Sequence, residues 1–233
     1  MRVELSGVTK GHDAEDLPAT SATFISGSVS LAVAETEQRP TVLGLIASGR
    51  MRPDTGTVTI DGRADARALR HSIALVDAPG VSDPDAGVPL VGVVAEELMF
   101  AGRRADPLAA RRWLDEVGFR SLASTAIADI APTTRLRVLC ELAVLRPDVV
   151  GLVVTAPDRH GGQPLDWWQL CGEFAERGFA VLAVAGRASE WAITHAEVIE
   201  RAEAAEASLR NSLGALDERT AAWAQSGGGV DNA

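Results

Sequence analysis

Residues 41–62 read TVLGLIASGRMRPDTGTVTIDG, and this stretch decides the fold. Its first part, 41–48, is apolar at helical spacing and is followed by Gly49, a residue typical of a helix C-cap. Residues 55–62 read as a turn, a strand and a second turn, and Asp61-Gly62 predicts a hairpin. The stretch therefore predicts a helix that leads directly into β-structure.

The rest of the chain alternates between strand and helix patterns. Continuous apolar runs at 149–154 and 179–184 are typical of strands buried on both faces, and 72–76 predicts a shorter one. Period-two alternation predicts a half-buried strand through 24–33, whereas the polar residues 11–21, with Pro18, predict a loop. Helical spacing predicts helices over 91–101, 107–117, 134–145 and 165–177. This order indicates a mixed α/β domain.

Composition excludes several classes of function. The 233 residues carry a formal net charge of −10, which disfavours nucleic-acid binding. Lys10 is the only lysine, so no mechanism that needs a lysine elsewhere in the chain is available. Apolar runs are too short to span a bilayer and no signal-peptide pattern opens the chain. We therefore expect a cytoplasmic protein, with a peripheral position at the inner face of the cell membrane as an alternative.

The order of these segments resembles the nucleotide-binding domain of ATP-binding cassette (ABC) transporters. Residues 41–62 are similar to the helix after that family's phosphate loop and the hairpin that follows it. Further matching segments are 74–76 before the Q-loop, 135–138 behind the signature motif, 149–157 at the Walker B strand and 181–184 before the switch histidine. The resemblance implies a P-loop NTPase-like ABC ATPase fold with a β-subdomain and a helical subdomain.

The resemblance also implies a domain organisation. The ABC-like domain would cover residues 1–200, with its helical subdomain at about 90–145. Residues 201–225 are predicted to form a C-terminal helical extension and 226–233 a disordered tail. Residues 196–224 have helical spacing and carry an apolar stripe that would pack on the domain or on another chain; it comprises Val198, Ala202, Ala205, Leu209, Leu213 and Leu216.

The phosphate loop that the resemblance implies is chemically altered. Such a loop needs glycines, a lysine for the phosphate oxygens and a serine or threonine for Mg²⁺. Residues 34–41 read AETEQRPT, with no glycine and with Pro40 at the lysine position. Thr41 matches the Mg²⁺ position, and Arg39 lies one residue before the lysine position. Arg39 and Thr41 are therefore the candidates for residual nucleotide contact.

The other catalytic positions of the family are altered as well. Thr155 and Ala156 fall on the Walker B aspartate and the catalytic glutamate, and Gly186 falls near the switch histidine. The Q-loop glutamine falls on Ala78, or on Asp77 with a one-residue shift. The signature motif falls on residues 130–134, IAPTT. No catalytic residue and no metal ligand is therefore predicted, and ATP with Mg²⁺ is disfavoured as a cofactor.

Three further features have more than one interpretation. Residues 158–162, DRHGG, fall where the ABC family has a loop that crosses to the partner subunit. We favour a turn at a subunit interface over acid–base chemistry for them. The Trp167-Trp168 pair is interpreted as core packing or an interface anchor. Charged residues at 96–97, 103–104 and 111–112 form a solvated face or a docking surface, since the family's helical subdomain receives a coupling helix of the membrane protein.

These observations favour a degenerate, non-hydrolysing homologue that is a structural or regulatory subunit of an ABC-type transporter or membrane complex. Its partner would be a membrane-embedded transporter subunit, an ABC-type ATPase subunit or a second copy, in a homo- or heterodimer. The alternative is a divergent ATP-binding subunit that completes a composite ATPase site with a partner chain. A third hypothesis is a domain that binds a different small ligand in the altered pocket.

Overall fold

The structure is a computed structural model that describes residues 1–35, 39–196, 198 and 201. The chain divides into two compact units, 1–191 and 192–233, and the architecture below is that of the first. The predicted tail 226–233 lies outside the described residues, as does the predicted extension 201–225 apart from residue 201.

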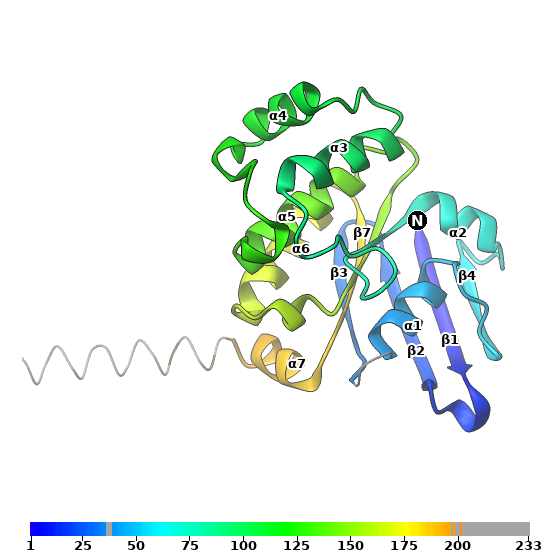
Figure 1. The fold of residues 1–233 in the computed structure, drawn as a ribbon. Helices are drawn as coiled ribbons and strands as arrows, with labels where there is room; N and C mark the ends of the chain where they lie inside the picture. The colour runs from blue at the N-terminus through cyan, green and yellow to red at the C-terminus, as the bar shows by residue number, and fades with distance from the viewer. Residues whose placement is uncertain (36–38, 197, 199–200, 202–233) are drawn as a thin grey trace, which may run out of the picture. The chain divides into compact units, whose positions relative to one another are not determined.

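A parallel sheet forms the centre of the first unit (Figure 1). Its strand order is β3-β7-β6-β5, with β3 at Ser28–Val33, β7 at Ala180–Ala185, β6 at Gly151–Thr155 and β5 at Ile73–Val76. Every residue of β5, β6 and β7 is buried. Helix α1 (Arg39–Ala47) lies on one side of the strands, whereas α5 (Pro132–Ala143) and α6 (Pro164–Glu176) lie on the other. The continuous apolar runs predicted these strands because helices cover both faces.

An antiparallel sheet packs beside α1, with strand order β2-β1-β4. Its strands are β1 (Arg2–Lys10), β2 (Leu17–Ile25) and β4 (Thr55–Ile60). The prediction of a loop over 11–21 was wrong from residue 17 onwards, because Leu17 is buried and β2 pairs with β1. Pro18 is compatible with β2 because this strand lies at the edge of its sheet. The predicted single strand 24–33 is divided, since β2 and β3 belong to different sheets.

The predicted turn at Asp61-Gly62 was correct, but the hairpin that it closes is limited to a single bridge. Both residues have positive φ, 48° and 77°, as a tight turn requires, but only an isolated bridge joins Ile60 to Arg63. The Asp65 carboxylate then accepts hydrogen bonds from two backbone amides and caps α2 (Ala66–Ser72). The chain therefore enters α2 directly after the turn and forms no second strand of a hairpin. Strand β4 pairs with β1.

Helices α3 (Leu90–Phe100) and α4 (Pro107–Glu116) pack on each other between β5 and α5 in the chain. Short 3-10 turns η2 (Arg120–Leu122) and η3 (Ile127–Asp129) precede α5. Two others are η1 (His12–Ala14) and η4 (Pro157–His160), and α7 (Arg187–Thr194) follows β7. Helix predictions for this region were correct to within two residues. No helix in the described residues is long and apolar enough to cross a membrane.

The two cysteines and the first tryptophan of the pair belong to the core. Cys140 and Cys171 are free and buried, and burial raises the pKa of the Cys171 thiol to about 12. Trp167 is 3% exposed, which supports core packing for this residue.

Candidate functional site

The carboxyl ends of β5 and β6 meet at one edge of the parallel sheet. In open α/β sheets this edge is where ligands bind. The residues directly after these strands are Asp77 and Ala156, and both have left-handed backbone, with φ of 55° and 48°. Such conformations are costly for a residue with a Cβ and concentrate at functional sites. This edge is therefore the candidate site.

Asp77 is the centre of a cluster of charged and titratable side chains, two of them buried and two partly buried, which we call the Asp77 cluster: Asp77, Arg135, Arg159 and His160. Arg135 Nη2 donates to Asp77 Oδ1 at 2.7 Å, and its Nε donates to Oδ2 at 3.4 Å. His160 Nε2 lies 3.0 Å from Oδ2. The side chains of Asp77 and Arg135 are 2% and 5% exposed. One carboxylate thus faces three cationic or potentially cationic groups.

Arg159 fills the space between the ends of the two strands. Its Nη1 donates to the backbone carbonyls of Asp77 and, at 3.2 Å, of Thr155. Its Nη2 lies 3.0 Å from Asp77 Oδ1, as an ion pair without hydrogen-bond geometry, and 3.5 Å from Asp83 Oδ2. The guanidinium therefore bridges β5 and β6 at the point where the sheet edge would meet a ligand.

The surroundings of His160 in the Asp77 cluster disfavour its protonated form. Burial lowers the pKa of His160, and the charges of Arg135 and Arg159 lower it further, whereas Asp77 raises it. The net shift is downward because desolvation is the largest effect. The lowered pKa favours the neutral imidazole, whose Nε2 can donate a proton to the Asp77 carboxylate.

Thr155 ends β6 with its side chain against α1. Its Oγ1 is buried and has no hydrogen-bond partner among the described residues. A Cβ placed on Gly44 would lie 2.7 Å from this oxygen, so helix and strand are in direct contact here. The arrangement leaves no room for a ligand between α1 and Thr155.

The structure places Arg39 and Thr41 in the first turn of α1, which begins two residues before the prediction. Thr41 Oγ1 donates to the Pro79 carbonyl at 3.4 Å, and Arg39 Nη2 donates to the Glu15 carbonyl at 3.3 Å. The two side chains thus bind different loops rather than one shared group. Arg39 also lines a cavity of about 130 Å³.

Two carboxylates accept hydrogen bonds from the backbone amides at the start of α7. The position that the resemblance assigns to the switch histidine lies in this region. Glu35 Oε1 accepts from the Arg187 amide at 2.7 Å. Asp158 Oδ2 accepts from the Gly186 amide at 3.0 Å and from Ser189 Oγ at 2.9 Å. The hydrogen-bond donors at this helix start that could bind an external anion are therefore already bonded to carboxylates of the chain itself.

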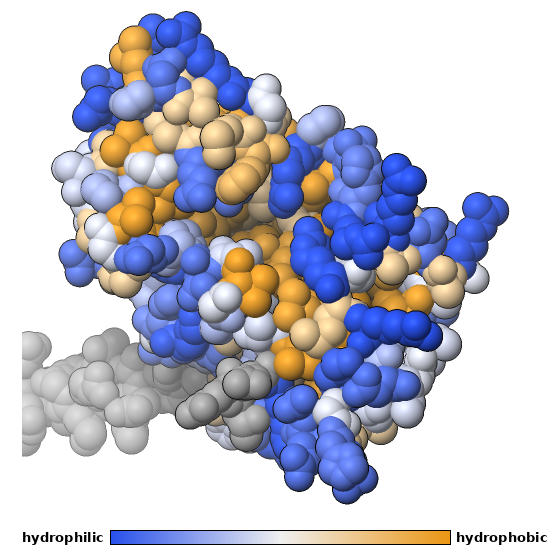
Figure 2. Space-filling model, turned by 45° about the vertical axis from the view of Figure 1, so that its right-hand side comes forward, coloured by the Kyte–Doolittle hydropathy of each residue, from blue (hydrophilic) through white to orange (hydrophobic). Residues whose placement is uncertain are grey.

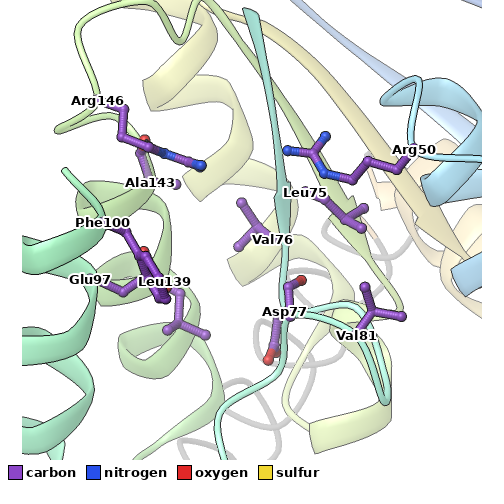
Figure 3. A pocket seen from close by; sticks show the side chains of 11 residues that line it. Arg50, Leu75, Val76, Asp77, Val81, Glu97, Phe100, Leu139, Ala143 and Arg146 are labelled. Atoms are coloured by element: carbon purple, nitrogen blue, oxygen red, sulfur yellow. Dashed lines mark hydrogen bonds between the residues drawn. The ribbon is translucent and has the colours of Figure 1, made fainter. Parts of the chain in front are cut away.

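A cleft of about 390 Å³, which Asp77 also lines, opens between β5, α3 and α5. Figure 2 shows this face of the molecule hollowed, with hydrophobic residues in the hollow and hydrophilic ones around it. In Figure 3, Arg50 and Arg146 point toward each other across the cleft. Burial lowers the pKa of Arg50, and the charges of Arg146 and Arg70 lower it further. Both guanidinium groups donate to backbone carbonyls: Arg50 Nη1 donates to Ser48 and Ile73, and Arg146 Nε donates to Ala143.

Apolar side chains lie around these two arginines. Phe100 and Val81 line the cleft and remain 59% and 51% exposed. Glu97 also lines it, and burial raises the pKa of this carboxyl despite the opposing charge of Arg146. The cleft thus combines exposed apolar surface with two converging positive charges.

Sequence reasoning missed the Asp77 cluster and the helix at 187–194. Arg135 carried a signal, because it shares the apolar stripe of its helix with Val138, Leu139 and Leu142, all buried. An arginine on a buried stripe needs a carboxylate partner. The interpretation of 158–162 as a turn was correct, since η4 ends there. Its role at a subunit interface stays a prediction.

Among the described residues, no group of three or more histidine, cysteine or acidic side chains is placed to hold a metal ion.

No protein-family model and no curated protein sequence matches the chain. Solved structures do. An ATP-binding subunit of an ABC transporter aligns with a TM-score of 0.52 at 17% identity over 80% of each chain. A nucleotide-free ATP-binding cassette from an ABC transporter gives a TM-score of 0.54 at 16% identity over 80% of this chain and 82% of that one.

A third structure is cbiO1 from Clostridium perfringens, part of the ABC transporter complex cbiONQ. It gives a TM-score of 0.52 at 14% identity over 79% of this chain and 77% of that one. At these identities the likeness concerns the fold alone. The chain has the mixed α/β, P-loop NTPase-like fold of ABC transporter ATP-binding subunits.

Proposed function

We propose that the chain is a degenerate, non-hydrolysing homologue of the ABC nucleotide-binding domain, acting as a structural or regulatory subunit of an ABC-type transporter or membrane complex. One observation carries this proposal: Arg159 fills the carboxyl edge of β5 and β6, held by Asp77 and the Thr155 carbonyl. The chain's own side chain thus occupies the edge at which a ligand of this fold class would bind.

The residues present do not fit MgATP. Thr155 and Ala156 offer no carboxylate at the positions that the resemblance assigns to the Walker B aspartate and the catalytic glutamate. The Thr41 hydroxyl donates to Pro79 instead of facing a metal ion. Glu35 and Asp158 place negative charge at the start of α7, where phosphate oxygens would be repelled. We therefore propose a subunit without a nucleotide cofactor.

Calorimetric titration of the purified chain with MgATP, up to millimolar nucleotide, tests the proposal. We expect no saturable heat at micromolar nucleotide. Losing two or three charge-assisted contacts weakens binding by about 3–9 kcal/mol, or about two to six decades, which moves a micromolar site to about 0.1 mM or weaker. Saturable binding at micromolar concentration would overturn the proposal.

A divergent ATP-binding subunit with a composite site is the second candidate. The observation in its favour is that Arg39 lies at the start of α1 and lines a cavity together with Glu35 and Arg187. This candidate predicts that Arg39→Ala and Thr41→Ala each lower ATPase activity of the assembled complex. An unchanged activity in both variants rejects it.

The partner that we propose is a membrane-embedded transporter subunit, and the cleft is its docking place. The described structural neighbours are ABC transporter subunits, which supports this kind of partner. A partner helix with apolar residues and one acidic side chain fits the cleft, because Arg50 and Arg146 converge there and form no ion pair with Asp77 or Glu97, the carboxyl groups that line the same cleft. A charge of opposite sign would relieve their repulsion.

Charge reversal tests the docking place. The tagged full chain is expressed in its native cells, and the membrane-embedded transporter subunit that co-purifies is quantified. We expect Arg50→Glu with Arg146→Glu to reduce recovery of that subunit strongly. Arg63→Glu with Arg67→Glu, at exposed arginines outside the cleft, is the matched control and should leave recovery unchanged. Equal losses in the two double variants would contradict the proposed docking place.

A further inference from the structure

The Asp77 cluster joins three segments that are distant in sequence. Asp77 follows β5, Arg135 lies on α5, and Arg159 and His160 lie in η4. Arg135 Nη1 also donates to the Ile127 carbonyl in η3 at 3.3 Å. A single carboxylate therefore holds the segment 127–135, which comprises η3 and the start of α5, and the turn 157–160 against the end of a central strand.

Because the Asp77–Arg135 pair is buried, each partner requires the other's charge. Asp77 and Arg135 are almost completely withdrawn from solvent, and a buried guanidinium without its carboxylate is strongly unfavourable. A glutamine, which the resemblance implies at position 77 or 78, would supply no compensating charge. The carboxylate thus matches the arginines that surround it.

We propose that Asp77 is a positioning residue that locks α5, and α3 packed on it, against the carboxyl end of β5 without any nucleotide. The same residue lines the cleft, whose walls include Phe100 and Glu97 from α3 and Leu139 from α5. Loss of the Asp77 contacts would therefore loosen α3 and α5, the helices that form the walls of the cleft. The significance of the cleft rests on the proposed function, whereas the lock depends only on the contacts of the cluster.

Hydrogen exchange of the full chain, measured by mass spectrometry without nucleotide, tests the lock. We expect Asp77→Asn to speed exchange at least about tenfold in peptides from α3, from 127–135 and from 77–83, while β6 and β7 keep their protection. Glu173→Gln is the matched control, because it breaks the exposed ion pair of Arg137 on the same helix α5. This control should leave exchange in α3 unchanged.

Two results would overturn the lock: unchanged exchange in Asp77→Asn, or a uniform increase that includes β6 and β7. If Asp77→Asn does not fold, the double variant Asp77→Asn with Arg135→Met takes its place, because it removes the more deeply buried of the two arginines that Asp77→Asn leaves without their carboxylate. The lock predicts a folded double variant with faster exchange in α3 and 127–135, and wild-type exchange there would reject it. Saturable MgATP binding in the calorimetric experiment would reject the proposed function and leave this result intact.

Discussion

Thr155 carries a buried hydroxyl without a hydrogen-bond partner among the described residues. Valine has nearly the same shape and no group to desolvate, so Thr155→Val should stabilise the protein by about 1 kcal/mol. Urea unfolding with an unchanged m-value measures this gain. Thr155→Asp is the counterpart, since a carboxylate next to Gly44 would be buried without a partner and should destabilise the fold. A less stable Thr155→Val would show that the hydroxyl is satisfied after all.

The lowered pKa of His160 predicts that the free energy of unfolding depends on pH. Its pKa in the folded protein lies below the ordinary 6.5, so the unfolded chain binds the proton more readily. Stability from this group is therefore complete above about pH 6.5 and is lost as the pH falls through the lower, folded pKa. His160→Gln keeps a donor for Asp77 and does not titrate. Unfolding free energies between pH 7.5 and about pH 5 should fall less in this variant than in the wild type, and equal slopes would exclude His160 as the cause.

Helix α5 offers a comparison between two arginines on one element. Arg135 is buried with Asp77, whereas Arg137 pairs with Glu173 at the surface, with side chains 34% and 50% exposed. Arg135→Gln should cost about 3–5 kcal/mol because it leaves the Asp77 charge buried with a weaker set of partners. Arg137→Gln should cost less than about 1 kcal/mol. Urea unfolding of both variants measures the difference, and similar costs would contradict the importance of burial.

The elements differ in how far sequence could predict them. Strands β6 and β7 were predictable because both faces are covered, which requires a continuous apolar run. Strand β2 was hidden because most of its side chains face solvent and Pro18 is allowed at an edge. Local patterns describe burial by neighbours along the chain and do not identify partners across it.

The strand ends that form the candidate site were predictable, and the contacts made there were not. The positions of Thr155, Ala156 and Gly186 followed from the order of segments. The Asp77 cluster did not, because Arg135 and His160 are separated from Asp77 by 58 and 83 residues. Only the folded sheet brings β5 and β6 together and reveals which charges share its edge.

At the scale of the whole molecule, ligand binding and stability are linked. A ligand that binds the native state at 100 times its dissociation constant adds about 2.7 kcal/mol of stability. For a domain of this size such a gain raises Tm by about 5–10 °C. An ATP site with a Kd of about 10 µM would therefore be visible in a thermal unfolding scan at 1 mM MgATP.

We expect no such shift, because internal side chains already occupy the edge of the sheet and the amides at the start of α7. The scan compares MgATP with Mg²⁺ alone and with a non-hydrolysable ATP analogue, so that the effect of the ion is separated from that of the nucleotide. Arg159→Ala is the informative variant, since it removes the side chain that fills the edge. An unchanged Tm on MgATP addition in both proteins would mean that the proposed loss of the phosphate loop, rather than Arg159, prevents binding. A rise confined to Arg159→Ala would instead identify this arginine as the group that excludes the nucleotide.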